Sequence, residues 1–244
     1  MIIDGHLHLP AKNIQNEMLD VMADNNLYGL MSAGNPAEWK HLQKLASTCK
    51  NIIPTYGLHP WYADQYSLDE ISPYLKGLIC LGEIGMDSVW CQVDLKKQYD
   101  VFLGQLDIAE EKQCPVILHT KGQEKEIANI IKDYTMPILV HWYSCDEFLS
   151  MYLEKGCYFT IGPDVKTNQA VKQVAKEAPI SHLLVESDGL SALEWVYGEK
   201  IEVEELPSYL IETMNVIGQI KGLSFKQVKE QMVKNLASYL ARRI

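Results

Sequence analysis

The chain has 244 residues, of which 47% are hydrophobic and 22% are charged, and it carries a formal net charge of −10 at pH 7. These values are typical of a globular protein and exclude a disordered or fibrous one, and the length suits one (β/α)8 barrel of about 250 residues. The net negative charge also argues against a broad basic surface that binds nucleic acid by counterion release. Cations bound at one point of the protein could still attract a phosphate group.

Short apolar runs separated by helical segments predict eight β-strands in chain order. The runs are residues 2–5, 27–32, 52–58, 78–84, 115–119, 137–141, 158–161 and 183–186. The clearest helical segment is residues 94–112, in which apolar side chains recur at spacings of three and four. Two closing helices are predicted after the eighth strand, at residues 205–222 and 224–243, and the second opens with a capping-box pattern of Ser224 and Gln227.

Strands that alternate with helices indicate a parallel sheet, for which two architectures are open. An open doubly wound sheet requires a reversal in strand order and usually a glycine-rich first turn, whereas the first turn here reads His6-Leu7-His8-Leu9. A closed barrel requires neither feature. We therefore predict a single-domain (β/α)8 TIM barrel over residues 1–244, with closing helices at its C-terminus.

The N-terminus and the cysteines bear on location. No stretch approaches the roughly 18 apolar residues needed to cross a bilayer, and the opening sequence MIIDGHLHLP lacks the features of a signal peptide. The six cysteines are scattered without a CxxC pair, which argues against a zinc ribbon, a redox motif or a disulfide framework. We expect a cytoplasmic protein with reduced cysteines and no membrane partner.

Histidine and carboxylate side chains stand at the ends of five predicted strands. Side chains alternate faces along a strand, so His6 and His8 point the same way. The other strands end in polar side chains at Glu83, His119, His141 and Asp188. Because the carboxyl ends of the strands of a (β/α)8 barrel form one mouth, we expect all six side chains to meet there.

These side chains suit a pair of divalent cations. Imidazole and carboxylate ligands together suit Zn, Mn, Fe or Ni, with Mg less natural because it prefers oxygen donors. Six ligands are too many for one tetrahedral ion, and a bridging carboxylate resolves the excess. We expect His6, His8 and Asp188 on one ion, His119 and His141 on the other, and Glu83 spanning both. Such a pair, about 3.5–4 Å apart, generates a hydroxide nucleophile near neutral pH, so the predicted reaction class is hydrolysis.

Six short motifs, in this order, resemble the TatD family of metal-dependent DNases within the amidohydrolase superfamily. They are HLH at residues 6–8, GLHP at 57–60, GEIGMD at 82–87, PVILHTK at 115–121, VHWYS at 140–144 and ESD at 186–188. The resemblance covers nearly the whole chain and implies a (β/α)8 fold, a two-metal centre with Glu83 as the bridge, and hydrolysis of phosphodiester bonds in DNA, often from the 3′ end. It implies single-stranded DNA or 3′ ends as the partner.

The resemblance also implies two contacts to substrate phosphate, His59 in GLHP and Lys121 two residues after His119. The family usually has arginine at the second position, so Lys121 offers a point charge where a bidentate fork is expected. The alternatives are that His59 supports the metal ligands and that Lys121 is a solvated loop residue.

The rim of the site departs from the family pattern. The eighth-strand motif reads Glu-Ser-Asp where the family usually has Glu-Thr-Asp, and a Gly-Leu-Ser sequence follows it. Four tryptophans lie in loops just after motif-bearing strands, namely Trp61, Trp90, Trp142 and Trp195. We expect them around the mouth, with Trp142 as a platform on which bases of a single strand stack, the alternative being that the rings only pack the loops.

Glu83 and Asp188 are the predicted catalytic residues, with Asp188 orienting the nucleophile and accepting its proton. Asp4 and Glu186 face the barrel interior and either support ligand histidines or pair structurally. Two other activities remain open: an amide, ester or lactone hydrolase with the same metal centre, and a non-catalytic subunit of a nucleic-acid-processing assembly. His41 and His182 are expected to be a surface residue and a structural residue.

Overall fold

An eight-stranded parallel sheet forms the centre of the computed structural model, which describes residues 1–240. The strands are β1 (Ile2–His8), β2 (Leu27–Ala33), β3 (Ile52–Tyr56), β4 (Cys80–Gly85), β5 (Val116–His119), β6 (Ile138–Val140), β7 (Tyr158–Ile161) and β8 (Leu183–Val185). Each strand pairs in parallel with the next along the chain. This order has no reversal, so the doubly wound alternative is excluded and the predicted barrel is confirmed.

The sheet curls until β8 lies beside β1, which makes the barrel nearly closed. Just beyond the strand ends, the Asp188 amide donates to the His6 carbonyl oxygen at 3.1 Å. Gly5 makes the close approach possible, because a Cβ at this position would lie 2.7 Å from Cγ2 of Thr160 and 3.0 Å from Cβ of Leu184. A larger residue would push β1 away from its neighbours.

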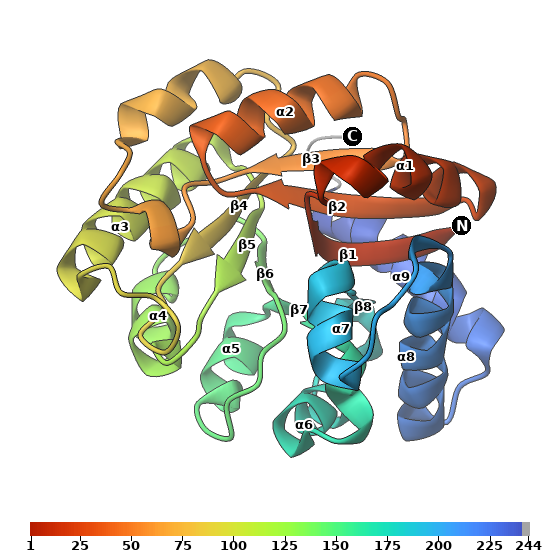
Figure 1. Ribbon diagram of the computed structural model, residues 1–244. Helices are drawn as coiled ribbons and strands as arrows, with labels where there is room; N and C mark the ends of the chain where they lie inside the picture. Colours follow the sequence, from red (N-terminus) through yellow and green to blue (C-terminus); the bar gives the residue numbers. More distant parts are fainter. Residues whose placement is uncertain (241–244) are drawn as a thin grey trace.

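Helices surround the barrel on the outside (Figure 1). They are α1 (Gln15–Asp24), α2 (Pro36–Ala46), α3 (Leu95–Lys112), α4 (Glu124–Ile131), α5 (Leu149–Lys155), α6 (Gln169–Glu177), α7 (Leu190–Tyr197), α8 (Leu206–Lys221) and α9 (Phe225–Leu240). Short 3-10 helices join them: η1 (Lys12–Ile14), η2 (Pro60–Tyr62), η3 (Leu68–Tyr74), η4 (Pro163–Lys166), η5 (Ile180–His182) and η6 (Val203–Glu205). Within residues 1–240, no helix combines the length and the apolar character that crossing a membrane requires.

Local sequence explains where the predicted helices begin and end. Helix α3 starts directly after Asp94, whose carboxylate accepts from two backbone amides of the first turn. The predicted capping box of α9 is present, since the Ser224 amide donates to Gln227 and the Gln227 amide donates to the Ser224 hydroxyl. The last predicted residues of this helix, 241–243, lie outside the described part of the chain.

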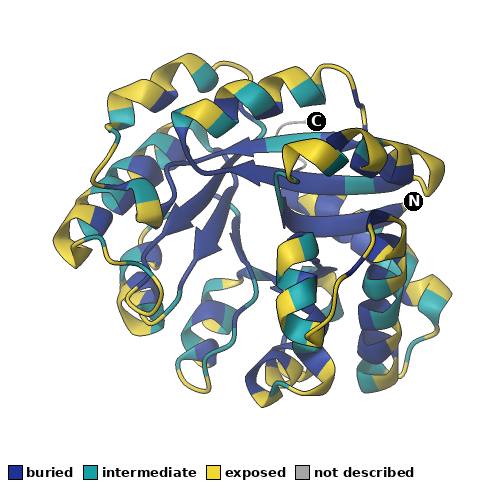
Figure 2. Cartoon of the chain, in the orientation of Figure 1, coloured by how far each residue is buried: buried dark blue, intermediate teal, exposed yellow. Residues whose placement is uncertain are grey.

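The strands are buried on both faces, as parallel strands covered by helices must be (Figure 2). The first strand is longer than the predicted run 2–5, because Leu7 and His8 still pair with Met31 and Ser32 of β2. The register shifts between Asp4 and Leu7. The longer strand carries both of its histidines to the end of the barrel where the other strands deliver their polar residues.

Candidate metal centre

The six predicted ligand residues converge at the carboxyl ends of the strands. A cavity of about 660 Å³ opens there, and five of the six line it. His6 is fully buried behind this lining, at the interior end of the cluster. The lining ligands are His8, Glu83, His119, His141 and Asp188.

One group of ligand atoms gathers around Oε2 of Glu83. This oxygen lies 3.4 Å from Nε2 of His6 and 3.3 Å from Nε2 of His8. Oδ1 of Asp188 lies 3.3 Å and 3.4 Å from the same two nitrogens. Ligand atoms of His6, His8 and Asp188 all lie within 4.8 Å of one another, which is close enough for a single cation to reach them.

A second group gathers around the other carboxylate oxygen of the same glutamate. Oε1 of Glu83 lies 2.7 Å from Nδ1 of His119 and 2.7 Å from Nε2 of His141. Nε2 of His59 is 3.6 Å from this oxygen and belongs to the same cluster of candidate ligand atoms. The two oxygens of Glu83 therefore contact different imidazoles, as the oxygens of a bridging carboxylate would. His6 and His141 are also close enough to form one group of candidate ligand atoms with Glu83.

Unsatisfied polar atoms mark this site. Within residues 1–240, the buried side-chain nitrogen and oxygen atoms that lack a hydrogen-bond partner all belong to it. They are Nε2 of His6, Oε2 of Glu83, Nδ1 of His141, Oδ1 of Asp188 and both carboxylate oxygens of Glu186. Burying such an atom unpaired costs about 1–3 kcal/mol, so this concentration needs a physical explanation. A divalent cation would satisfy several of these lone pairs at once, and the mixed imidazole and carboxylate donors fit Zn or Mn.

The charges around Glu83 are strongly coupled. Burial alone would raise the pKa of its carboxyl group, but His141, His59 and His6 hold that pKa well below its usual value. In return, burial would lower the pKa of His6, and the nearby Glu83 and Asp188 carboxylates raise it to about 9. Glu83 is therefore ionised at neutral pH, with its charge directed toward the imidazoles that surround it.

Sequence reasoning missed Asp87, which holds one of the ligand histidines. Its Oδ2 accepts from Nε2 of His119 at 3.2 Å and from Nε1 of Trp61 at 2.8 Å. Its Oδ1 accepts from the amides of Val89 and Trp90. Burial would raise the pKa of Asp87, yet these hydrogen bonds keep it well below the usual value. The motif GEIGMD ends at this residue, and that position was the available signal.

A serine positions His6 in the same way. Oγ of Ser32 lies 3.2 Å from Nδ1 of His6 and 2.7 Å from the hydroxyl of Thr55. This contact leaves Nε2 of His6 directed at the site. A buried histidine whose second nitrogen is held by a neighbour has a fixed ring orientation, which is the usual arrangement of a metal ligand.

The two inward-facing carboxylates have different surroundings. Asp4 accepts from the amide and the hydroxyl of Ser187, at 3.0 Å and 2.5 Å, so it joins β1 to the end of β8. Burial raises the pKa of Asp4 to about 7. Glu186 lies beside a ligand instead, with Oε2 3.5 Å from Nδ1 of His141. Of the two alternatives, structural pairing describes Asp4 and support of a ligand histidine describes Glu186.

The two residues expected to contact phosphate both line this cavity, in different surroundings. His59 is buried, and its Nδ1 accepts from the Trp61 amide, which leaves Nε2 among the candidate ligand atoms. Nζ of Lys121 donates to the Ser144 hydroxyl at 3.0 Å and lies 4.8 Å from the centre of the Trp90 ring. Lys121 therefore belongs to the cavity wall rather than to a free loop, while His59 lies against the metal side.

All four rim tryptophans line the cavity, as expected, but their surroundings differ. Trp142 is half-buried, and its indole N–H donates to Oδ1 of Asp164 at 2.8 Å. Its ring fits against Gly162, where a Cβ would lie 2.5 Å from Nε1. Trp195 is 70% exposed, and its ring centre lies 6.3 Å from that of Trp142 and 6.4 Å from that of Trp90. We call these three rings, Trp90, Trp142 and Trp195, the tryptophan wall.

Trp195 lies on α7, a helix that the sequence did not predict.

The two remaining histidines lie away from the centre, since His182 packs on Tyr158 and His41 is half-buried against Gln15. The expected surface position of His41 is therefore wrong in part, because its ring nitrogen bonds to Gln15 at 2.9 Å.

Comparisons with known proteins agree with this description. The family model described as TatD related DNase matches residues 3–241. An uncharacterised metal-dependent hydrolase of Methanocaldococcus jannaschii is 29% identical over 80% of this chain and 78% of its own length. TATDN3 of Mus musculus, named as an unproven deoxyribonuclease, is 22% identical over 96% of this chain and 86% of its own. The crystal structure of YJJV, a TatD homolog from Escherichia coli, superposes with a TM-score of 0.84 at 20% identity, covering 98% of this chain and 97% of that one.

Proposed function

The chain belongs to the family of TatD-related DNases, which are metal-dependent hydrolases, and from this premise we propose a two-metal phosphodiesterase that degrades DNA from 3′ ends. The observation that carries the proposal is the pair of ligand sets on either side of one glutamate. Glu83 directs Oε2 at His6 and His8 and Oε1 at His119 and His141. A single carboxylate in this position suits two cations better than one.

The proposed ligands divide as the distances suggest. His6, His8 and Asp188 would hold one cation, His119 and His141 the other, and Glu83 both. Zn, Mn or Mg bound there would polarise the phosphoryl oxygens and lower the pKa of a water molecule. His59 lies close enough to Oε1 of Glu83 to bind either a cation or a substrate oxygen.

Glu83 and Asp188 are the proposed catalytic residues. Burial would raise the pKa of Asp188, but the neighbouring imidazoles of His6 and His8 lower it, so the carboxylate is ionised at neutral pH. Its backbone has a φ of 58°, in the left-handed region that aspartate tolerates better than most residues. The ionised carboxylate can orient a water molecule and accept its proton as the oxygen attacks phosphorus and the bond from phosphorus to the leaving oxygen breaks. Glu83 would help to hold the same water molecule.

Substrate would be held by charge on one side and by rings on the other. We propose that Lys121 and His59 contact the oxygens of the scissile phosphate. Lys121 donates as an ammonium point charge, which suits a phosphate even without the bidentate geometry of arginine. Trp142, with the rest of the tryptophan wall, would stack against a base next to that phosphate. The partner is single-stranded DNA or a 3′ end.

A second activity is kept open by the charge of the cavity lining. Glu38, Glu124 and Asp164 line the cavity beside the candidate ligands, and among residues 1–240 Lys121 is the one lysine or arginine in that lining. An acidic rim repels a polyanion and tolerates a neutral ester, amide or lactone. The ligand set, which is present in full, argues against a non-catalytic subunit. We also propose the cytoplasm as the location, because the six cysteines are scattered without a CxxC pair.

The deciding experiment compares substrate classes on one preparation. The protein is loaded in turn with Zn, Mn and Mg and assayed against bis-p-nitrophenyl phosphate, a single-stranded oligonucleotide labelled at either end, and a panel of esters and lactones. We expect hydrolysis of the phosphodiesters and progressive shortening of the oligonucleotide from its 3′ end. A Glu83→Gln variant controls for contaminating nuclease. Hydrolysis confined to esters or lactones would contradict the phosphodiesterase proposal and support the ester, amide or lactone hydrolase instead.

A further inference from the structure

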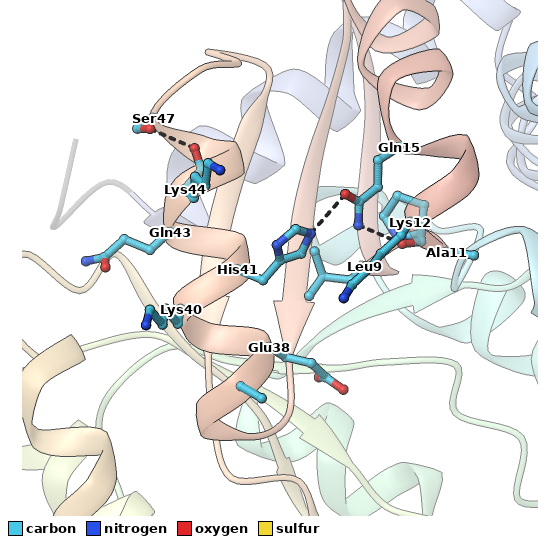
Figure 3. Close-up of a pocket in the computed structure, with 12 residues that line it drawn as sticks. Leu9, Ala11, Lys12, Gln15, Glu38, Lys40, His41, Gln43, Lys44 and Ser47 are labelled. Atoms are coloured by element: carbon cyan, nitrogen blue, oxygen red, sulfur yellow. Dashed lines mark hydrogen bonds between the residues drawn. The ribbon is translucent and has the colours of Figure 1, made fainter.

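A second groove, of about 870 Å³, lies on the outside of the barrel beside α2. One side of it is the segment from Leu9 to Gln15, and the other is the outer face of α2 (Figure 3). Three lysines line this groove, Lys12 on η1 and Lys40 and Lys44 on α2. We call it the basic groove.

The positive charge of the basic groove has no internal partner. Within residues 1–240, the ammonium groups of Lys12, Lys40 and Lys44 make no ion pair and no hydrogen bond, although acidic residues outnumber basic ones by 32 to 22 in this protein. Glu38 is the one carboxylate in the lining, and its Oε2 already accepts from the Gly34 amide at 2.8 Å. The groove is thus a local positive surface on an acidic molecule.

Two of the three lysines lie close together on one helix. Lys40 and Lys44 are four residues apart on α2, so their like charges lie on neighbouring turns of one face and repel each other. His41 lies between them and turns the other way, toward Gln15, in Figure 3. A ligand with negative charges along its length would relieve this repulsion.

The basic groove and the metal cavity meet. Leu9 and Glu38 line both of them, and Leu9 directly follows the candidate ligand His8. From this junction the groove follows α2 from Ala37 to Ser47, a length of roughly 15 Å at the rise of an α-helix. A chain that leaves the candidate metal centre past Leu9 would enter the groove at once.

We propose that the basic groove binds the phosphate backbone of a nucleic-acid single strand whose scissile phosphate lies at the metal centre. The inference rests on the proposed phosphodiesterase function and extends it from the single phosphate to the flanking strand. The rest of the cavity rim carries Glu124 and Asp164, which repel flanking phosphates. The exit past Leu9 also carries one carboxylate, Glu38, which accepts from the Gly34 amide, but it leads to three lysines and is therefore the favourable one. Ammonium groups contact phosphate without reading bases, so this binding is independent of sequence and sensitive to salt.

A matched pair of double variants tests the proposal. Lys40→Gln/Lys44→Gln removes two charges from the basic groove. Lys172→Gln/Lys176→Gln removes two charges at the same spacing from α6, on exposed positions that line neither cavity. Binding is measured by fluorescence anisotropy with labelled oligothymidylates of about 4 and about 16 nucleotides, over a range of salt concentrations. Each protein is metal-loaded, and Ca²⁺ is the added cation so that cleavage is slow during the measurement.

We expect the groove variant to bind the long oligonucleotide about tenfold more weakly, with a salt dependence shallower by about 0.7 per lysine removed. The short oligonucleotide and the rate with bis-p-nitrophenyl phosphate should not change, and the α6 variant should behave as the wild type. Equal losses in both variants, or equal losses for both lengths, would overturn the proposal. Length-dependent binding with no hydrolysis of any phosphodiester would leave the groove standing and refute the proposed function instead.

Discussion

Three imidazoles at the candidate centre direct one nitrogen at the cluster of candidate ligand atoms while a neighbour holds the other nitrogen. Nδ1 of His6 contacts Ser32, Nε2 of His119 contacts Asp87, and Nδ1 of His59 accepts from the Trp61 amide. Contacts of this kind fix ring orientation and tautomer before any cation arrives. At the scale of single residues, the site therefore depends on neighbours that touch no substrate.

Asp188→Asn should abolish turnover while keeping much of the metal binding. The amide retains an oxygen for a cation but cannot accept a proton, so kcat with bis-p-nitrophenyl phosphate should fall at least about 100-fold. Metal content of the purified variant, measured by elemental analysis, should stay close to that of the wild type. A variant with full activity would show that Asp188 is not the base.

Asp87→Asn should weaken metal binding without touching a ligand. The Asp87 carboxylate accepts a hydrogen bond from Nε2 of His119 and so makes the imidazole a stronger metal ligand. A neutral amide does this less well, so the affinity for the cation should fall by about 10- to 100-fold, as measured by calorimetry. Asp164→Asn is the matched control, because Asp164 bonds to Trp142 and lies away from the ligand histidines. Equal metal affinities in the wild type and the Asp87 variant would show that Asp87 does not support His119 as a metal ligand.

At the scale of elements, hydrogen bonds from α9 hold the start of β8 in place. Asn235 of α9 is buried, and its side-chain amide donates to the carbonyl oxygens of Ile180 at 2.7 Å and Leu183 at 2.6 Å. These two residues flank the entry to β8, whose far end carries Glu186 and Asp188 toward the site. The closing helix thus sets the position of the strand that supplies one of the proposed ligands.

Asn235→Ala should lower the free energy of unfolding by roughly 2–4 kcal/mol. The change removes two hydrogen bonds from a buried position, and the Ile180 oxygen keeps only its bond from the Leu183 amide. Each lost bond costs about 0.5–1.5 kcal/mol, and about 1–3 kcal/mol where the oxygen is left without a donor. Urea denaturation followed by circular dichroism measures the loss. Asn129→Ala on α4 serves as the control, because the Asn129 amide bonds to its own helix at an exposed site and its removal should cost under about 0.5 kcal/mol. Similar losses in the free energy of unfolding for the two variants would contradict the role of α9 in holding β8 in place.

At the scale of the whole molecule, the barrel brings together residues that are far apart in the chain. The candidate ligands come from β1, β4, β5 and from positions just after β6 and β8, and they meet because all of these strands run in the same direction. A cation that binds several strands at once links the ends of the barrel. Metal binding should therefore be coupled to the stability of the entire fold.

Adding metal should raise the melting temperature, and chelation should lower it. A cation present at about 100 times its Kd adds about 2.7 kcal/mol, which corresponds to roughly 5–10 °C for a chain of this size. Differential scanning calorimetry with and without Zn or Mn tests the effect. The Glu83→Gln variant should show a smaller rise, and a wild-type protein indifferent to every divalent cation would argue against a metal centre.

The sequence by itself determined the barrel and the set of candidate ligands. Regular alternation of apolar runs and helical segments indicates a parallel sheet, and residue parity on a strand decides which side chains share a face. His6, His8 and Glu83 follow from these periodic rules, as does their position at the strand ends. Periodic structure is readable because the backbone geometry repeats.

Tertiary structure alone decided what lies in the loops. The bond from His119 to Asp87, the contact of Trp142 with Asp164 and the meeting of the basic groove with the metal cavity each involve a loop segment whose backbone has no repeating geometry. Short loops adopt whichever conformation the packed elements allow, so their side-chain partners depend on neighbours distant in the chain. For the same reason Lys121 could be named from a motif, while its place against Trp90 emerged only once the barrel had folded.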